Sequence, residues 1–237
     1  MRAVGVQLFH RRRTLGDEHP NTLSSINSLG VLFQGQGKYD EAESLYRTVL
    51  SSNPQDDQAR AQLSLLLVAR EEPDQAIIFC RTRRRTDRLQ LRLSKKLSGV
   101  EGIHGDMPQS RRTRVMKKFR EAQVKILVAT DVIGRGIDVT GVSHIVNFDT
   151  PQYCDDYVHR IGRTGRMGRE GVAYTFVSTE EGKLLTQIEI RVNQLLERGE
   201  MDGFETVARE PLEDRKDKKA PPASLMKRPP KRYRRGV

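Results

Sequence analysis

Residues 125–131, Lys-Ile-Leu-Val-Ala-Thr-Asp, are the stretch that most directly decides the fold. A short apolar run suited to a buried strand ends in Thr130 and Asp131, which open a glycine-containing loop. Similar runs occupy residues 76–80, 144–148 and 172–177, with a weaker one at 100–103. Helical patterns separate them, at residues 84–97, 110–121, 154–162 and 180–198. This alternation predicts a parallel sheet covered by helices on both faces, with ligand-contacting residues in the loops at the carboxyl ends of the strands.

The composition narrows the class of partner. The chain has 237 residues, 36% of them hydrophobic, and a formal net charge of +11. We expect a polyanion as partner, and nucleic acid rather than a membrane surface, because no long apolar or basic amphipathic helix stands out. Arg11, Arg12 and Arg13 interrupt the first apolar residues before a signal sequence can form. Cys80 and Cys154 lie far apart and predict neither a zinc cluster nor a disulfide, so we expect a cytoplasmic protein with reduced cysteines.

The first region, residues 1–72, is helical by pattern. Its apolar and small residues follow the spacing of a helix-turn-helix repeat of about 34 residues. These residues are Ile26, Leu29, Gly30, Phe33, Ala42, Tyr46, Val49 and Pro54. The pattern resembles a tetratricopeptide repeat, and residues 15–22 resemble the longer repeats of kinesin light chains. Residues 56–70 would supply the first helix of a second repeat, but its second helix is missing.

About three such repeats are usually needed for stability. The single repeat is therefore a remnant, or it packs on something else. Two roles remain open for it: a docking surface for a protein, or a helical prop that binds no ligand.

The third region, residues 208–237, is predicted to be a disordered basic tail. Residues 227–235 contain six basic residues and no acid. Low apolar content with proline and like charges does not offset the entropy lost on ordering. Such a tail would serve as an electrostatic tether to nucleic acid, or as a solubilising or localisation segment. The middle region then spans residues 73–207.

Four motifs follow one another in this middle region. Residues 77–82 (IIFCRT) form a buried strand that ends in a polar loop, and residues 104–112 (HGDMPQSRR) lead from a loop into a helix. The third and fourth motifs are residues 129–138 (ATDVIGRGID) and 159–166 (HRIGRTGR). In the fourth, arginines stand on a glycine-rich corner, where Gly162 and Gly165 let a ligand approach the backbone. That corner predicts phosphate binding.

Together these motifs resemble motifs IV, IVa, V and VI of the second RecA-like lobe of DEAD-box ATP-dependent RNA helicases. The resemblance covers residues 74–179. It implies that Arg163 and Arg166 reach the γ-phosphate of an ATP held mainly by the other lobe, and that His159 couples this site to that lobe. It also implies that Asp138 accepts hydrogen bonds from ribose hydroxyls, with Gly136 leaving room beside it.

The resemblance further implies a grip on the sugar-phosphate backbone of RNA by Gln109, Arg112 and Thr130, with Arg81 less firmly matched. Gln109 and Arg112 share one helix face by their i, i+3 spacing. No reader of base edges is evident, so we expect binding that does not depend on sequence.

Each role has a structural alternative. Asp138 would also suit a helix cap, Thr130 and Asp131 would cap the turn that follows them, and Arg112 would pair with a surface acid. Arg135 has no assigned role, and no metal ligand is predicted.

A complete helicase of this kind needs a first lobe, with a phosphate loop ending in Gly-Lys-Thr or Gly-Lys-Ser and an acidic motif for Mg²⁺. The sequence contains neither, and residues 35–39 (GQGKY) lack the spacing and the hydroxyl. We therefore expect the chain alone neither to bind ATP tightly nor to hydrolyse it, and ATP with Mg²⁺ to act only when a first lobe is supplied. A gene fusion, a truncated reading frame and a one-lobe regulator would each give this arrangement.

Three functions follow as hypotheses. The first is the second lobe of an ATP-dependent RNA helicase, which contributes arginine fingers and contacts to the RNA backbone. The second is a non-enzymatic adaptor that holds RNA while its N-terminal helices dock a protein. The third keeps the helicase assignment with DNA as substrate.

Overall fold

The computed structural model describes residues 11–71, 73–131, 139, 142–165 and 171–197. All of them belong to one structural unit, residues 1–198. Three residues with predicted roles lie outside the described residues: Gly136, Asp138 and Arg166. Arg135, to which no role was assigned, also lies outside them. The predicted disordered tail, residues 208–237, also lies outside them.

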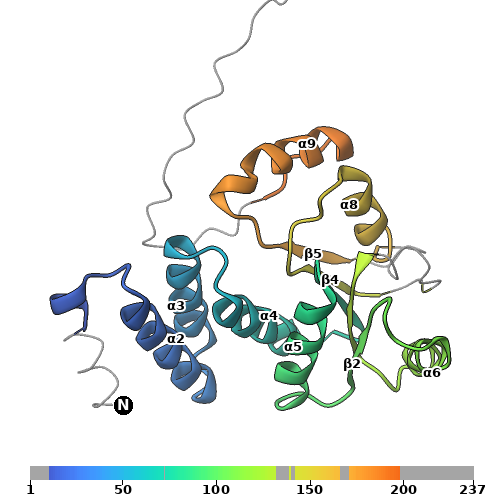
Figure 1. Cartoon of the computed structure of the whole chain (residues 1–237), viewed down its shortest axis with the longest axis horizontal. Coiled ribbons are helices and arrows are strands. Elements are labelled where there is room, and N and C mark those ends of the chain that lie inside the picture. Colours follow the sequence, from blue (N-terminus) through green and yellow to red (C-terminus); the bar gives the residue numbers. More distant parts are fainter. Residues whose placement is uncertain (1–10, 72, 132–138, 140–141, 166–170, 198–237) are drawn as a thin grey trace, which may run out of the picture. The chain divides into compact units, whose positions relative to one another are not determined.

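A parallel sheet of five strands forms the centre of the unit, as predicted (Figure 1). Its strands are β1 (Ala76–Phe79), β2 (Val100–Ile103), β3 (Ile126–Ala129), β4 (His144–Asn147) and β5 (Val172–Thr175). They lie in the order β2-β3-β1-β4-β5. The register pairs Phe79 at the end of β1 with Ala129 and with Asn147, so these strands end at one level. Each predicted strand is therefore present, within two residues of its expected ends.

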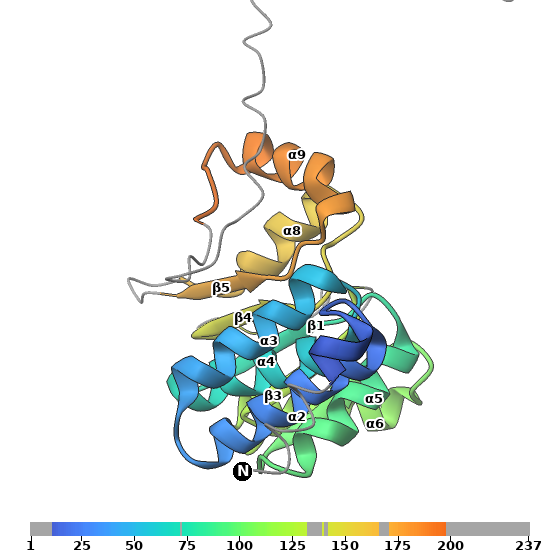
Figure 2. The same ribbon diagram turned by 90° about the vertical axis from the view of Figure 1, so that its left-hand side faces the viewer.

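Four helices of the middle region follow the predicted pattern. They are α5 (Arg83–Ser94), α6 (Gln109–Arg120), α8 (Cys154–Ile161) and α9 (Gly182–Val192), the last preceded by a 3₁₀ helix, η1 (Thr179–Glu181). The predicted helix at residues 180–198 ends early because Asn193 adopts a left-handed conformation, with φ of 53°, and caps α9. Figure 2 shows α8 and α9 next to each other, on the side of the sheet where β5 lies.

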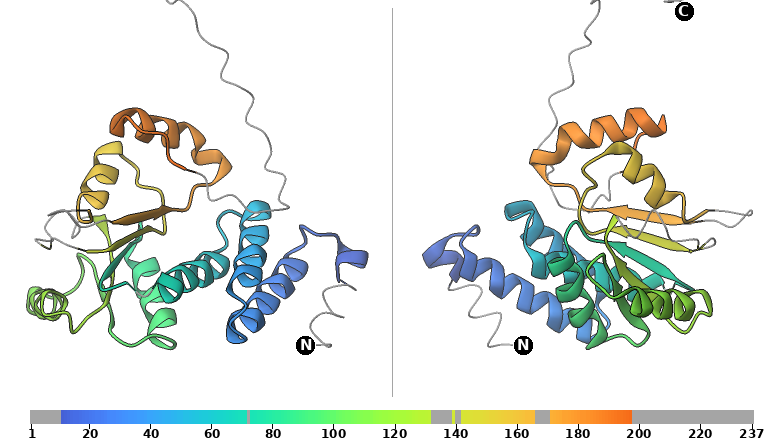
Figure 3. Two further views of the ribbon diagram at one scale, coloured as in Figure 1. Left: turned by 180° about the vertical axis from the view of Figure 1, so that it is seen from behind. Right: turned by 45° about the vertical axis from the view of Figure 1, so that its right-hand side comes forward.

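Helices cover both faces of the sheet. Successive side chains of a strand point to opposite faces, so each strand contributes to two cores. Ile77 and Phe79 of β1 share one core with Val115 and Phe119 of α6. Ile78 points the other way, into a core with α4 (Asp57–Glu71) and α5. The residues that α4 and α5 contribute to this second core are Ala61, Leu65, Val68, Leu89 and Leu93. Figure 3 shows α6 on the face of the sheet opposite α5.

The N-terminal region forms a helix pair, α2 (Pro20–Gly35) and α3 (Tyr39–Ser52). The two helices are joined at Gly37, whose φ of 75° suits the predicted turn. Gly30 lets the ring of buried Tyr46 approach α2, because a Cβ at this position would come within 2.6 Å of the ring carbon Cε1. This close helix packing agrees with the predicted repeat.

Helix α4 packs in two directions. Its residues Leu63, Leu66 and Leu67 join a core with Ala42 and Tyr46 of α3. Its other side lies in the core of the sheet. The single repeat therefore packs on α4, a helix that also covers one face of the sheet (Figure 1). This contact buries the apolar face of the repeat, which a neighbouring repeat would otherwise bury.

Candidate functional site

Polar residues gather at the carboxyl edge of the sheet, where the parallel strands end together. Thr82 follows β1, His104 follows β2, Thr130 and Asp131 follow β3, and Asp149 follows β4. Four of the five come from the first three motifs or border them, and the fold brings these motifs to one edge as the alternating pattern predicted.

Arg160 of α8 joins the third and fourth motifs. Its guanidinium is almost fully buried, with 2% of the side chain exposed. Nε donates to Oδ1 of Asp131 at 2.6 Å, and Nη2 donates to Oδ2 at 2.8 Å. Nη1 donates to Oδ1 of Asn147 at 2.9 Å and to the carbonyl oxygen of Asp149 at 2.8 Å. The guanidinium lies 5.0 Å from the ring centre of Phe79, so every part of it is engaged.

The sequence analysis assigned no role to Arg160, and it offered Asp131 only as a possible cap. Both carboxylate oxygens of Asp131 instead accept from Arg160 in a bidentate pair. One signal was present in the sequence: Arg160 directly follows His159 within the arginine-rich fourth motif.

A second contact holds the segment that follows the third motif against the fourth motif. The hydroxyl of Thr164 donates to the carbonyl oxygen of Ser143 at 3.0 Å, and Val142 and Thr164 form an isolated parallel bridge. Residues 132–138, 140 and 141 lie outside the described residues. The described residues on both sides of that segment, Asp131 and Val142, are nevertheless held against the fourth motif.

Of the residues predicted to serve the phosphate site, His159 and Arg163 lie at the end of α8, whereas Arg166 lies outside the described residues. His159 is exposed on the helix, and Arg163 is half-buried immediately after the capping residue Gly162. The backbone N–H of Arg163 donates to the carbonyl oxygen of Arg160 at 3.2 Å. Gly165 has a φ of 66°, which favours glycine at this position. Arg163 is thus carried on a short, backbone-bonded turn.

The predicted RNA-gripping residues come from two elements. Gln109 and Arg112 lie in the first turn of α6, with Gln109 exposed and Arg112 half-buried. The Nε of Arg112 is buried and has no hydrogen-bond partner among the described residues. Thr130 is 6% exposed at the end of β3, and its N–H faces the carbonyl oxygen of Ile103 at 3.4 Å.

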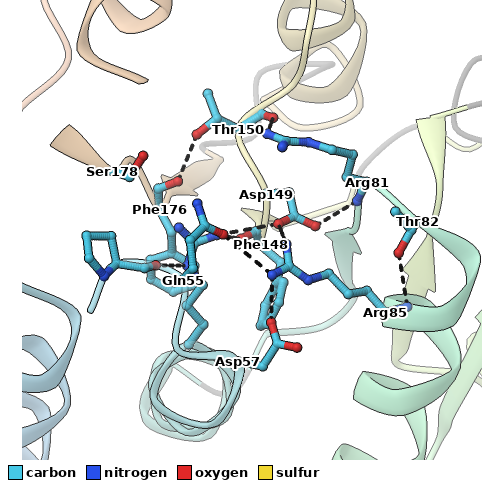
Figure 4. Close-up of polar contacts among 12 residues, drawn as sticks. Gln55, Asp57, Arg81, Thr82, Arg85, Phe148, Asp149, Thr150, Phe176 and Ser178 are labelled. Atoms are coloured by element: carbon cyan, nitrogen blue, oxygen red, sulfur yellow. Dashed lines mark hydrogen bonds and ion pairs between the residues drawn. The ribbon is translucent and has the colours of Figure 1, made fainter. Parts of the chain in front are cut away.

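Arg81, the fourth predicted RNA contact, is tied to other residues at the same edge (Figure 4). Its N–H donates to Oδ2 of Asp149 at 2.8 Å. Its Nη2 donates to the carbonyl oxygen of Thr150 at 3.1 Å and to Oε1 of Glu181 at 2.9 Å. Burial acts to raise the pKa of Glu181, but hydrogen bonds from Ser178, Thr150 and Arg81 outweigh it and leave the pKa below its ordinary value.

Asp149 is the centre of a buried charge cluster that the sequence analysis missed. Only 1% of Asp149 is exposed, and its carboxylate also pairs with the guanidinium group of Arg60. It pairs as well with the guanidinium group of Arg85 (Figure 4). Arg60 belongs to α4 and donates to the carbonyl oxygen of Phe148 at 2.9 Å. Burial lowers the pKa of Arg60, and the charge of Asp149 opposes this shift. Arg60 and Asp149 therefore form a buried ion pair.

The other predictions about chemistry concern cysteines, metals and membranes. Cys80 is buried, and burial raises the pKa of its thiol. Among residues 11–71, 73–131, 139, 142–165 and 171–197, no group of three or more His, Cys, Asp or Glu could hold a metal ion. Within the same part of the chain, no helix has the length and apolar character needed to span a membrane.

Two regions of the chain match known protein families. Residues 58–168 match the helicase conserved C-terminal domain, and residues 10–55 match a tetratricopeptide repeat. The DEAD-box ATP-dependent RNA helicase CshA of Geobacillus kaustophilus is 50% identical over 128 residues, which make up 54% of this chain and 27% of that protein. The chain thus spans about a quarter of the length of this curated relative.

Solved structures agree with this match. The E. coli DEAD-box protein SrmB, bound to the regulator of ribonuclease activity A, superposes with a TM-score of 0.57 at 34% identity, over 66% of this chain and 92% of that one. The C-terminal domain of the DEAD-box protein Dbp5 gives a TM-score of 0.53 at 34% identity, over 56% of this chain and 78% of that one. Residues 58–168 therefore carry the C-terminal RecA-like domain of DEAD-box RNA helicases, and a tetratricopeptide repeat precedes this domain in the chain.

Proposed function

We propose that this chain is the lobe that completes the ATP site and grips the RNA backbone in an ATP-dependent RNA helicase. The observation that carries the proposal is the Arg160–Asp131 pair, because it fixes the arginine-rich turn against the end of β3. In the proposal, residues from both motifs act as one rigid surface toward a first lobe.

Arg163 and Arg166 are the proposed contacts to the γ-phosphate. The donor set fits that group, since guanidinium groups offer planar, bidentate donors to phosphoryl oxygens, and the half-buried position of Arg163 limits its motion. ATP bound there would supply the phosphoanhydride bond that is cleaved, with Arg163 and Arg166 holding its terminal phosphate. His159 is the proposed link to the first lobe, and Asp138 with Gly136 the proposed ribose contact. The β-phosphate and Mg²⁺ are assigned to the first lobe.

Gln109, Arg112 and Thr130 are the proposed contacts to the RNA backbone. The buried Nε of Arg112, without a partner among the described residues, is a donor suited to a phosphate oxygen. Arg81 must leave Glu181 before it can reach RNA. We therefore expect Arg81 to contribute least of the four.

A reconstitution experiment tests the proposal. The chain is mixed with a separately expressed first lobe from a related DEAD-box helicase, and ATP hydrolysis is followed with and without RNA. We expect no turnover from either part alone and RNA-stimulated turnover from the mixture. Arg163→Ala should lower that turnover by about 10³-fold. The control is Arg191→Ala, which removes an exposed arginine of α9 that pairs with Asp155.

Three results would contradict the proposal. Turnover by the pure chain that is lost in Arg163→Ala would show a self-sufficient site. Equal stimulation by single-stranded DNA would favour a DNA substrate. No gain from any first lobe, combined with RNA binding, would favour the adaptor hypothesis, in which α2 and α3 dock a protein.

A further inference from the structure

A groove with a volume of about 250 Å³ lies between α4 and α5. None of the residues assigned to ATP or RNA lines it. Gln58 and Gln62 form the α4 side, and Arg92 with Lys95 and Lys96 forms the α5 side. We call it the α4–α5 groove.

The rim of the α4–α5 groove is positively charged. Its lining contains three basic side chains and no acidic one. Arg92 donates to the backbone carbonyl oxygen of Asp57 at 3.1 Å, and within the described part of the chain it forms no ion pair with a carboxylate. Lys95 and Lys96 are exposed at the end of α5. A partner that neutralises this rim must carry negative charge.

The floor of the groove is apolar. Leu65 of α4 and Leu93 of α5 line it, together with Ala61. Such a floor gains from contact with an apolar side chain. A sugar-phosphate backbone has none to offer, and no aromatic side chain lines the groove for a base to stack on. The combination of charged rim and apolar floor therefore favours a protein segment over RNA.

Gln62 points to the same class of partner. Its Oε1 is buried and has no hydrogen-bond partner among the described residues. A buried acceptor of this kind needs a donor, because leaving it unsatisfied costs about 1–3 kcal/mol. The N–H groups of a peptide backbone are donors that can satisfy it.

The α4 wall of the groove is held in place by packing on the opposite side of the helix. Leu63 and Leu66, on the other side of α4, pack against α3. The wall that carries Gln58 and Gln62 is thus fixed between the repeat and the sheet, so little ordering is needed on binding.

We infer that the α4–α5 groove is a docking site for an acidic protein segment that inserts at least one large apolar side chain between Gln62 and Lys96. Its acids would face Arg92, Lys95 and Lys96, and its backbone would donate to Oε1 of Gln62. This site is independent of ATP and of the proposed RNA surface.

Binding of a fluorescent synthetic peptide tests the inference. The peptide consists of glutamates with leucine at every third or fourth position, and its affinity for the full chain is measured by anisotropy. The variant Lys95→Glu/Lys96→Glu should weaken binding by about tenfold. The matched control is Lys117→Glu/Lys183→Glu, which makes the same charge change on exposed residues of α6 and α9. If both variants lose affinity equally, attraction is unspecific and the inference is wrong.

Two further arms separate the apolar contact from the charge. Gln58→Trp places a large side chain at the groove from an exposed position on α4 and should block the peptide without disturbing the core. A peptide with serine in place of leucine should bind at least about tenfold more weakly, because buried apolar area is lost. Equal binding of the two peptides would overturn the inference. It would also be overturned if RNA fully displaced the peptide both from the original chain and from Lys95→Glu/Lys96→Glu.

Discussion

Arg60 of α4 reaches Asp149 at the carboxyl edge of the sheet, with Nη1 3.4 Å from Oδ1 and with only 2% and 1% of the two side chains exposed. The same guanidinium donates through Nε to the carbonyl oxygen of Pro54 at 2.6 Å. Arg60 therefore links the loop before α4 to the end of β4. Through Asp149, the link extends to Arg81 and Arg85.

Arg60→Ala should destabilise the fold strongly. The variant leaves the buried carboxylate of Asp149 with fewer partners, and breaking one partner of a buried pair costs about 3–5 kcal/mol. Urea unfolding measures the loss in the free energy of unfolding. Arg70→Ala is the control on the same helix, where a half-exposed arginine pairs with Asp40 and Glu43. Its loss should stay below about 1 kcal/mol, and equal losses in the two variants would refute the anchoring role of Arg60.

Arg160 should be irreplaceable by lysine. An ammonium group cannot reproduce the fork that pairs with both oxygens of Asp131 while also reaching Asn147. A double-mutant cycle of Arg160→Lys with Asp131→Asn should give a coupling energy of about 0.5–3 kcal/mol.

The exposed pair Arg191–Asp155 supplies the comparison, since 59% and 66% of its side chains are exposed. Its coupling should be no more than about 1 kcal/mol. A coupling for Arg160 and Asp131 that does not exceed that of the exposed pair would show that their contact is not maintained in solution.

The sheet could be predicted because its signal is local. Apolar runs such as residues 126–129 are buried on both faces of a parallel sheet, and they stand out from the charged helices between them. The turn between the two helices of the repeat was also predicted, and Gly37 adopts a positive φ there, which favours glycine.

The charge clusters could not be predicted in the same way. Arg60 and Asp149 are 89 residues apart, and Arg160 and Asp131 are 29 apart, so no local pattern pairs them. The double role of α4 did leave a trace. Its apolar residues occupy two stripes, and each stripe packs into a different core.

The glycines of α2 should respond in opposite directions to alanine. Gly30→Ala forces the buried ring of Tyr46 to move, because the new Cβ would lie 2.6 Å from Cε1, and we expect a loss of about 1–3 kcal/mol. Gly35→Ala meets nothing within 4 Å and removes a flexible residue from the helix end, so stability should stay the same or rise slightly. Thermal unfolding compares the two. A Gly30→Ala variant as stable as Gly35→Ala would contradict the close packing of α2 on α3.

Glu181 should make stability fall at acid pH. The pKa of Glu181 lies below its ordinary value of 4.5, so the folded state holds this carboxylate charged where the unfolded chain begins to bind a proton. Its stabilisation is present above about pH 4.5 and is lost as the pH falls through the lowered pKa. Glu181→Gln should therefore flatten the decline of the unfolding free energy below that pH. The exposed neighbour Glu180, changed to glutamine, should leave the decline unchanged, and identical profiles for both variants would contradict the contribution of Glu181.

Arg163 and Arg112 should separate turnover from RNA binding in the reconstituted two-lobe assay. Arg163 is proposed to act on the phosphoryl group, so Arg163→Ala should lower kcat by about 10³-fold and leave the RNA concentration for half-maximal stimulation nearly unchanged. Arg112 is proposed to hold a phosphate of the RNA, so Arg112→Ala should raise that RNA concentration and reduce the salt dependence of binding by about one phosphate contact. Arg114→Ala, an exposed arginine of the same helix, is the control and should change neither quantity substantially. If Arg112→Ala lowered kcat at saturating RNA as Arg163→Ala does, the first turn of α6 would belong to the nucleotide site and the proposed division between the two arginines would be wrong.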